Sequence, residues 1–222
     1  MLTYNVGVTQ PQHHRLPAED RRRQLLDTAL DFFSRKGFEG TTTKEIANAA
    51  GVTEAIIFRH FPSKQALYNA VLNYHHESGE TDAVLALWKP LMDANDDTGL
   101  LRSLVEFVIL GYRRDARVHR ALLFAALEGH QAGLAQHRER SLPIFELLCQ
   151  YVARRQGEGA IRADIPAAAV VGSLVGAAAH YGMMTEFFGF CNASSDSDVA
   201  SSFLDILLHG ILPAATSGKA TA

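Results

Sequence analysis

Residues 42–64 read TTKEIANAAGVTEAIIFRHFPSK, and this stretch decides how the chain is organised. Thr42 and Glu45 stand three residues apart, the spacing of a capping box, which predicts that a helix begins at about Thr43. Gly51 follows the last apolar residue of that helix and can adopt the left-handed conformation that ends it. The pattern therefore predicts a short helix that stops at a tight turn.

A second short helix is predicted directly after the turn. Thr53 is placed to cap its start, Pro62 stops it, and Ser63 can cap a further helix. The apolar positions that should face inward from the two helices are Ile46, Ala47, Ala50, Ile57 and Phe61. Two such helices joined by a Gly-containing turn form a helix-turn-helix, whose second helix lies in the major groove of DNA. On pattern alone, an ordinary pair of packed helices remains the alternative.

The segment FRHFPSKQALYNAV, preceded by TTTKEIANAAGV, resembles the DNA-binding domain of the TetR family of repressors. The similarity runs from about Arg22 to Val71 and depends on the order KGF, TT, IA, AGV and RHFPSK. It implies an all-α protein, with an N-terminal three-helix helix-turn-helix domain, a larger helical ligand-binding and dimerisation domain, and about nine helices in total. Beyond residue 75, only the length and the helical pattern agree with the family.

We expect three parts along the chain. Residues 1–18 should form a flexible N-terminal arm, residues 19–74 the helix-turn-helix DNA-binding domain, and residues 75–222 the helical effector-binding and dimerisation domain. A helix over residues 64–74 is predicted to be the only mechanical link between the two domains. The helices predicted after it cover residues 76–94, 98–114, 116–129, 132–156, 166–188 and 198–211.

Charge is unevenly distributed along a chain whose formal net charge is −3. Residues 19–73 hold eight Lys or Arg against seven Asp or Glu, whereas residues 74–222 hold twelve against seventeen. The first segment is therefore a small basic island on an acidic protein. DNA binding must depend on where individual basic groups lie, including the run Arg21-Arg22-Arg23, which either touches phosphates or forms a solvated helix start.

The family resemblance assigns contacts with DNA phosphates to Thr43, His60 and Lys64. The family usually has Tyr at position 58, and Phe58 has no hydroxyl for that contact. Base recognition is expected from the exposed early face of the second helix, with a partner such as Lys44 or Arg59 holding Glu54 away from the phosphates. The full set of expected DNA-binding residues is Thr43, Lys44, Thr53, Glu54, Ala55, Ile56, Phe58, Arg59, His60 and Lys64.

The segment Pro166–Thr185 carries no formal charge over 20 residues. That length can span a bilayer, and Gly172-x-x-x-Gly176 suits a membrane helix pair. Its many Ala and Gly residues and the lack of a flanking basic cluster instead favour a soluble helix buried on nearly all sides. In the family, the last two long helices pair with their copies in a second subunit. The residues expected at this homodimer interface are Ala168, Gly172, Gly176, Ala179, Phe203 and Leu207.

Helices of the larger domain enclose an effector pocket in the family. Such pockets are mostly apolar with a few polar groups, and Met and aromatic side chains adapt to irregular apolar ligands. His180, among Ala, Met and Tyr, is the best polar candidate, although a hydrogen-bonded core histidine fits the same pattern. The expected ligand-binding residues are Phe107, Phe124, Phe145, His180 and Met184, for an apolar effector of aromatic or acyl character.

Other chemistries find little support. Glu128, His130 and His137 lie close enough in sequence to hold a metal, but a Gly-rich hinge with exposed histidines explains them equally well. No nucleophile elbow, HExxH, Walker loop or dinucleotide motif occurs. We therefore expect no metal, no cofactor and no enzymatic activity. The two cysteines, Cys149 and Cys191, form no metal or disulfide framework, and the first residues lack the pattern of a signal peptide, so a cytoplasmic protein is expected.

The sequence is best interpreted as a homodimeric transcriptional repressor that binds palindromic operator DNA and is released by a small apolar effector. A DNA-binding regulator controlled by a protein partner, without a small ligand, is the alternative within the same class. An all-helical enzyme is the alternative from a different class. Selection of binding sites from random DNA is the most informative experiment on these hypotheses.

Overall fold

The structure is a computed structural model that describes residues 16–73, 80–190 and 195–211. Within these ranges the chain forms helices and no strand, which confirms the all-α class. The helices are α1 (Ala18–Lys36), α2 (Thr43–Ala49), α3 (Glu54–His60), α4 (Lys64–Leu72), α6 (Glu80–Asp93), α7 (Asp97–Leu127), α8 (Gln131–Gly157), α9 (Ala167–Phe188) and α10 (Asp196–Ile211). Nearly all of the predicted arm lies outside the described residues.

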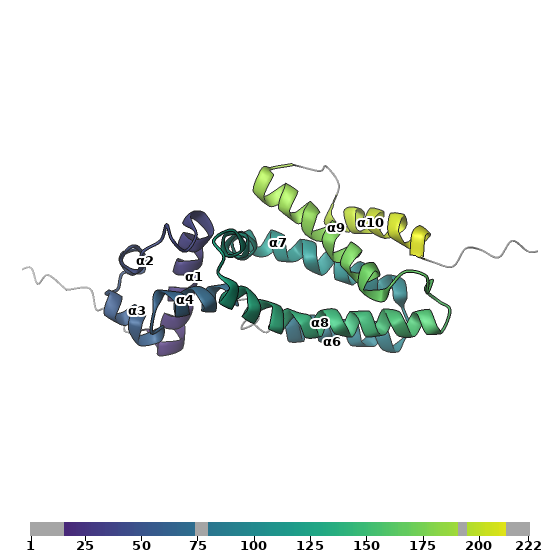
Figure 1. Cartoon of the computed structure of the whole chain (residues 1–222), viewed down its shortest axis with the longest axis horizontal. Helices are drawn as coiled ribbons and strands as arrows, with labels where there is room; N and C mark the ends of the chain where they lie inside the picture. The colour runs from purple at the N-terminus through teal and green to yellow at the C-terminus, as the bar shows by residue number, and fades with distance from the viewer. Residues whose placement is uncertain (1–15, 74–79, 191–194, 212–222) are drawn as a thin grey trace, which may run out of the picture.

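The helices form an elongated molecule (Figure 1). Helices α1 to α4 gather at one end, which we call the head, and α6 to α10 form the rest, which we call the body. Helix α7 contacts α9 and α10 in the body and also α1 and α4 in the head. Helix α8 also contacts α4, so α7 and α8 both join the body to the head.

The start of α2 is a complete capping box, as predicted. The Thr42 hydroxyl accepts the backbone N–H of Glu45 at 3.2 Å, and the Glu45 carboxylate accepts the backbone N–H of Thr42 at 2.9 Å. Hydrogen bonds from Lys36 and then from Thr42 lower the pKa of Glu45 to about 2. The helix start is thus specified by side chains within a few residues of it.

The turn between α2 and α3 also follows the sequence signals, with one correction. Gly51 has φ +66°, the left-handed conformation expected of it. The Ser63 hydroxyl accepts the backbone N–H of Ala66 at 3.0 Å and caps α4. Thr53 occupies the N-cap position of α3, but its side chain makes no capping hydrogen bond, so the predicted cap is wrong. Thr53 is exposed instead, directly before the start of α3.

The core of the head is completed by the body. The buried apolar residues of the head pack with Val118, Ala121 and Ala125 of α7. They are Leu25, Leu26, Ala29, Leu30, Phe33, Ile46, Ala47, Ala50, Ile57, Phe61, Leu67, Tyr68, Val71 and Leu72. The Tyr68 hydroxyl donates to the carbonyl of Ala121 at 3.2 Å, and Arg117 pairs with Asp27 of α1 at 2.8 Å. The prediction that α4 is the only link is therefore wrong. Short apolar residues on α7 face the head, and their spacing alone does not reveal which helix covers them.

Helix α7 is kinked at Asp115, where the sequence predicts a break between two helices. Asp115 has φ −157° and ψ 88° inside an otherwise helical segment. The Asp115 carboxylate accepts hydrogen bonds from the backbone N–H of Arg117 at 3.0 Å and from the Arg117 guanidinium at 2.8 Å. The side chain thus satisfies a backbone donor that the kink frees. Arg113, on the other side of the kink, contacts Glu186 of α9 and Asp196 of α10 at 2.5 and 3.0 Å.

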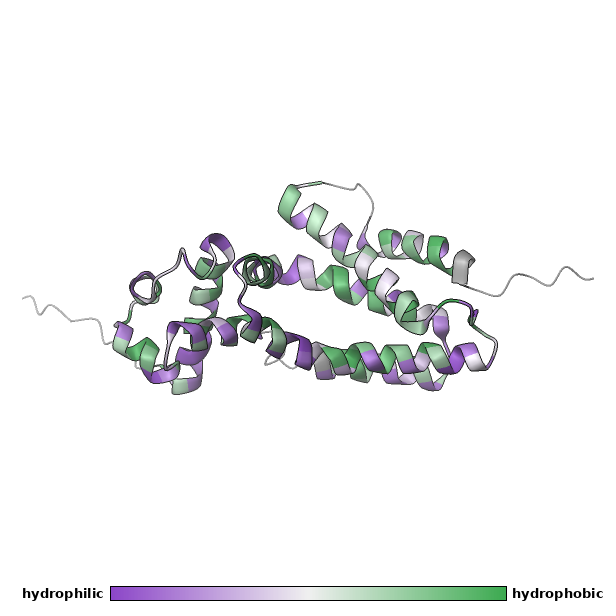
Figure 2. Cartoon of the chain, in the orientation of Figure 1, coloured by the Kyte–Doolittle hydropathy of each residue, from purple (hydrophilic) through white to green (hydrophobic). Residues whose placement is uncertain are grey.

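One face of α9 is buried in the body and the other is exposed. Only 28% of the most apolar 18-residue window of α9 is buried, so the prediction of a helix buried on nearly all sides is wrong for a single chain. Gly182 lies on the buried face, where an added Cβ would come within 2.5 Å of Cγ of Tyr112. Within the described ranges, α9 is the one helix long and apolar enough to cross a membrane, by length and composition only, a test that core helices of soluble proteins also pass. Figure 2 shows its largely apolar length.

Candidate nucleic-acid interface

The outer face of α3 carries most of the residues expected to contact DNA. Ile57 is fully buried and anchors the helix in the head core. Thr53, Ala55 and Arg59 are exposed, and Phe58 is 44% exposed, an unusual place for a large apolar ring. Lys44, on α2, is also exposed. The helix therefore presents side chains of mixed character on the side that a major groove would meet.

Glu54, the first residue of α3, has a hydrogen-bond partner on α2. The Thr43 hydroxyl donates to Oε1 of Glu54 at 2.6 Å. The sequence predicted Lys44 or Arg59 as the partner of this carboxylate, and the structure gives Thr43 instead. The geometry of the turn brings the first residues of α2 and α3 together, which spacing along the chain does not show.

His60, at the end of α3, lies in a partly buried and electropositive place. Its Nε2 atom is buried and has no hydrogen-bond partner within the described residues. Burial first, and then the charges of Arg59, Arg22 and Arg21, lower the pKa of His60 below 6.5. The buried position therefore favours the neutral imidazole, which can still donate one N–H to a phosphate.

Lys64 lies at the start of α4 with its ammonium group over an aromatic ring. Its Nζ atom is 4.1 Å from the centroid of Phe38, a cation–π contact. Phe38 also contacts the body, since its ring centroid is 4.5 Å from that of His130 and its backbone N–H donates to Glu128 at 2.8 Å. The side chain of Lys64 is thus held in place by a residue that also contacts the body.

A basic residue outside the expected set lies beside Arg59. Arg21 of α1 lines the same hollow of about 390 Å³ as Ile56 and Arg59 of α3. From sequence, the Arg21-Arg22-Arg23 run could either contact phosphates or form a solvated helix start. Arg21 lies near α3 because of the way α1 packs in the head, which the sequence does not show. The Arg22 guanidinium lies 5.1 Å from the ring centroid of Phe61.

The five residues expected to bind an effector do not form one cluster. Phe107 packs on the body core at 5.7 Å from Trp88, and Phe145 packs on the same core. Phe124 lies instead at the junction with the head, beside Gly37. His180 is exposed, so the expectation of a polar group inside an apolar pocket is wrong for this residue. Met184 is half-buried on α9.

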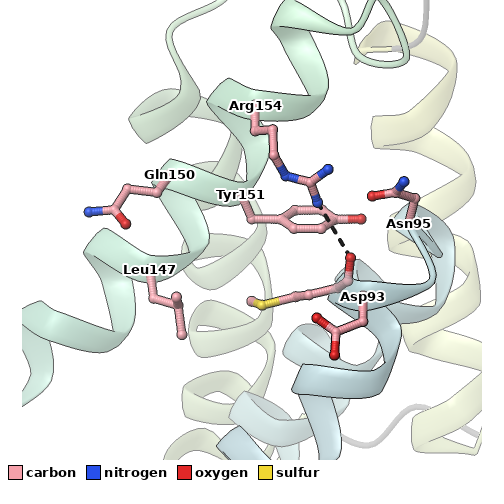
Figure 3. Close-up of a pocket in the computed structure, with 7 residues that line it drawn as sticks. Asp93, Asn95, Leu147, Gln150, Tyr151 and Arg154 are labelled. Atoms are coloured by element: carbon pink, nitrogen blue, oxygen red, sulfur yellow. Dashed lines mark hydrogen bonds between the residues drawn. The ribbon is translucent and has the colours of Figure 1, made fainter.

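A hollow in the body lies away from those residues. It has a volume of about 490 Å³ and lies between the end of α6 and the C-terminal half of α8 (Figure 3). In it the Arg154 guanidinium lies 5.1 Å from the Tyr151 ring centroid and donates to the carbonyl of Met92 at 3.4 Å. Arg154 also pairs with Glu158 at 2.9 Å, a carboxylate that Arg155 contacts as well.

His130, at the α7–α8 connection, is part of the packing between head and body. Among the residues that the structure describes, no three His, Cys, Asp or Glu side chains are placed to hold a metal ion. His130 packs against Phe38 and Tyr68 and is 3.5 Å from Glu128, so the expectation of exposed hinge histidines is wrong for it. Glu128 accepts the backbone N–H groups of Phe38 and Glu39 at 2.8 and 3.3 Å. Sequence reasoning considered Glu128 only as a metal ligand and missed this role.

Three of the small residues expected at the dimer interface lie on the outer face of α9. Ala168, Gly172 and Gly176 are exposed, and an added Cβ at either glycine would meet nothing within 4 Å. Ala179 is half-buried, as are Phe203 and Leu207 of α10. Ile206 of α10 is 73% exposed, which leaves apolar surface uncovered next to the α9 face.

A family model described as bacterial regulatory proteins, tetR family, matches residues 25–71. The chain is 32% identical over 146 residues to the nucleoid occlusion factor SlmA of Klebsiella pneumoniae (strain 342), covering 63% of this chain and 71% of SlmA. It is 28% identical over 168 residues to the transcriptional activator FasR of Mycolicibacterium smegmatis, covering 76% of this chain and 75% of FasR. The crystal structure of AibR in complex with isovaleryl coenzyme A and operator DNA has the same fold, with a TM-score of 0.64 and 22% identity over 84% of this chain and 97% of AibR.

The fold and the exposed α3 define a helix-turn-helix DNA-binding protein of the all-α class. The chain belongs to the TetR family of transcriptional regulators. FasR is a transcriptional activator and the matching family model describes bacterial regulatory proteins; this chain is likewise a transcriptional regulator and not an enzyme.

Proposed function

We propose that the protein is a homodimeric repressor that binds palindromic operator DNA through α2 and α3 and is released by a small apolar effector. The observation that carries the proposal is the exposed α3, whose outer face presents Arg59, Phe58 and Ala55 while Ile57 anchors it. A two-fold dimer requires two half-sites about one helical turn, or a multiple of it, apart. Residues 19–74 serve as the DNA-binding domain and residues 75–222 as the effector-binding and dimerisation domain.

The dimer is supported by the apolar surface that one chain leaves exposed. The outer face of α9 has no side chain larger than a methyl group at Ala168, Gly172 or Gly176, so a second helix backbone can approach closely there. Exposed apolar residues of α10, such as Ile206, extend the same surface. Exposed apolar patches of this kind mark interfaces. The dimer would also cover the exposed His180.

The effector site is proposed on the body core beside Phe107 and Phe145, which both pack on it. These side chains are half-buried and aromatic, which suits an acyl or aromatic ligand. AibR binds isovaleryl coenzyme A in its crystal structure, which supports an acyl ligand as the first class to test here. A change in Trp fluorescence of Phe145→Trp on titration with acyl-coenzyme A thioesters would support this site. If the fluorescence does not change with either acyl or aromatic compounds, the proposed effector site is refuted.

The experiment that tests DNA recognition is selection of binding sites from random DNA, followed by affinity measurements on single-base variants. Arg59→Ala should lower the preference at one base pair by about 1–3 kcal/mol, because a bidentate Arg–guanine contact carries roughly that discrimination. An equal loss of affinity on every variant would make Arg59 a phosphate contact. Reporter expression from the selected operator with and without the protein distinguishes a repressor from an activator, the role in the name of FasR.

A further inference from the structure

Two consecutive threonines at the start of α2 make different contacts. Thr42 forms the capping box with Glu45, so the first turn of α2 is satisfied without Thr43. The Thr43 hydroxyl instead donates to Oε1 of Glu54, across the turn, at 2.6 Å. This hydroxyl is therefore free of any capping task and is committed to the first residue of the recognition helix.

Glu54 stands where α3 would enter the major groove. Its neighbours Thr53 and Ala55 are exposed, while Glu54 itself is half-buried against α2. Within residues 16–73, 80–190 and 195–211, its second carboxylate oxygen, Oε2, has no hydrogen-bond partner. A carboxylate in the major groove can accept a hydrogen bond from the N4 amino group of cytosine.

We infer that Thr43 is a positioning residue for base recognition, which fixes one carboxylate oxygen of Glu54 so that the other is presented to a cytosine. The inference rests on the proposed function, in which α3 lies in the major groove. A hydroxyl has a single proton, so Thr43 cannot donate to Glu54 and to a phosphate at the same time. The phosphate contact that the family resemblance assigns to Thr43 is therefore replaced in this chain by a contact through Glu54.

The physical benefit of this arrangement is preorganisation. An unrestrained Glu side chain loses rotamer freedom when it binds a base, and a carboxylate near the DNA backbone is repelled by phosphates. The hydrogen bond from Thr43 fixes the side chain before DNA arrives, so less entropy is lost on binding. It also holds the charge on the α2 side of the turn. Removal of the hydroxyl should therefore lower discrimination at one base pair instead of general affinity.

The test compares Thr43→Val, which keeps the shape and removes the hydroxyl, with Thr43→Ser, which keeps the hydroxyl. Affinities of the full-length protein for a panel of single-base variants of the selected operator are measured by fluorescence anisotropy. Thr43→Val and Glu54→Gln should each lower the preference for C·G at the same position by roughly tenfold, the size of one lost hydrogen bond to a base. The double variant should lose no more than either single variant, and Thr43→Ser should retain the preference.

Two outcomes would overturn the inference. An equal loss of affinity for every operator variant in Thr43→Val would make Thr43 a phosphate contact, and an unchanged base preference would make its hydrogen bond to Glu54 purely structural. Thermal unfolding of each variant controls for folding, and Thr43→Ala supplies the same comparison if valine crowds the turn. If the wild-type protein selects no DNA site, the proposed function itself is overturned. If the wild type selects a site and Thr43→Val keeps the same base preference, only this inference is overturned.

Discussion

Glu128 provides the most direct test of how the head is attached to the body. Its carboxylate accepts the backbone N–H groups of Phe38 and Glu39 at 2.8 and 3.3 Å, and its side chain is only 18% exposed. Glu128→Gln keeps the shape but replaces one acceptor oxygen with an NH₂ group, which then faces a donor. A hydrogen bond to a charged acceptor contributes about 1.5–3 kcal/mol, so the variant should lower the free energy of unfolding by about 2 kcal/mol.

The assay is urea unfolding followed by circular dichroism at one fixed protein concentration, because the apparent stability of a dimer depends on concentration. Glu139→Gln is the matched control, since Glu139 is exposed on α8 and makes the same chemical change without these contacts. The same variants are then compared in binding to the selected operator. Glu128→Gln should weaken binding to all operator variants alike, because it loosens the orientation of the whole head and leaves α3 unchanged.

The reasoning would be refuted if Glu128→Gln unfolds at the same urea concentration as Glu139→Gln and the wild type. Such a result would mean that the turn after α1 is held by other contacts. The candidates are the aromatic contacts of Phe38 with Phe33, Tyr68 and His130. A loss of operator affinity at a single base pair would also contradict it.

Three further predictions follow from positions in the body and the head. Gly182→Ala places a Cβ 2.5 Å from Cγ of Tyr112, so it should lower stability by about 1–3 kcal/mol in urea unfolding, whereas Gly157→Ala, where a Cβ meets nothing within 4 Å, should not. Gly176→Glu places a charge on the proposed dimer surface and should produce a monomer by light scattering; a wild type that is already monomeric at micromolar concentration would refute the dimer. Because the pKa of His60 is lowered in the folded chain, the unfolded chain binds more protons than the folded chain as the pH falls. The free energy of unfolding should therefore fall between pH 7.5 and 5.5, and it should fall less in His60→Gln. An identical pH dependence in the variant would contradict this.

Local signals made the helix-turn-helix predictable from sequence. The capping box of Thr42 and Glu45, the left-handed Gly51 and the Ser63 cap act within a few residues, so their geometry follows from spacing alone. The apolar positions of α1 to α3 are predictable for the same reason, since helical periodicity assigns them to one face. Thr53 is the exception, because a residue suited to capping can point its hydroxyl elsewhere.

Contacts between distant residues were decided only by tertiary structure. Thr43 meets Glu54 because the turn folds α3 back on α2, and Glu128 meets Phe38 because α7 packs across α1. The exposure of His180 likewise depends on which face of α9 its neighbours cover.

Sequence by itself determined the helices, their ends and the DNA-binding motif of this protein. Tertiary structure decided which side chain holds Glu54, which helices complete the head core and which face of α9 stays open. The physical reason is the range of the interactions. Caps and turns depend on backbone groups a few residues away, whereas packing and long-range hydrogen bonds depend on which surfaces of separate helices the whole chain brings together.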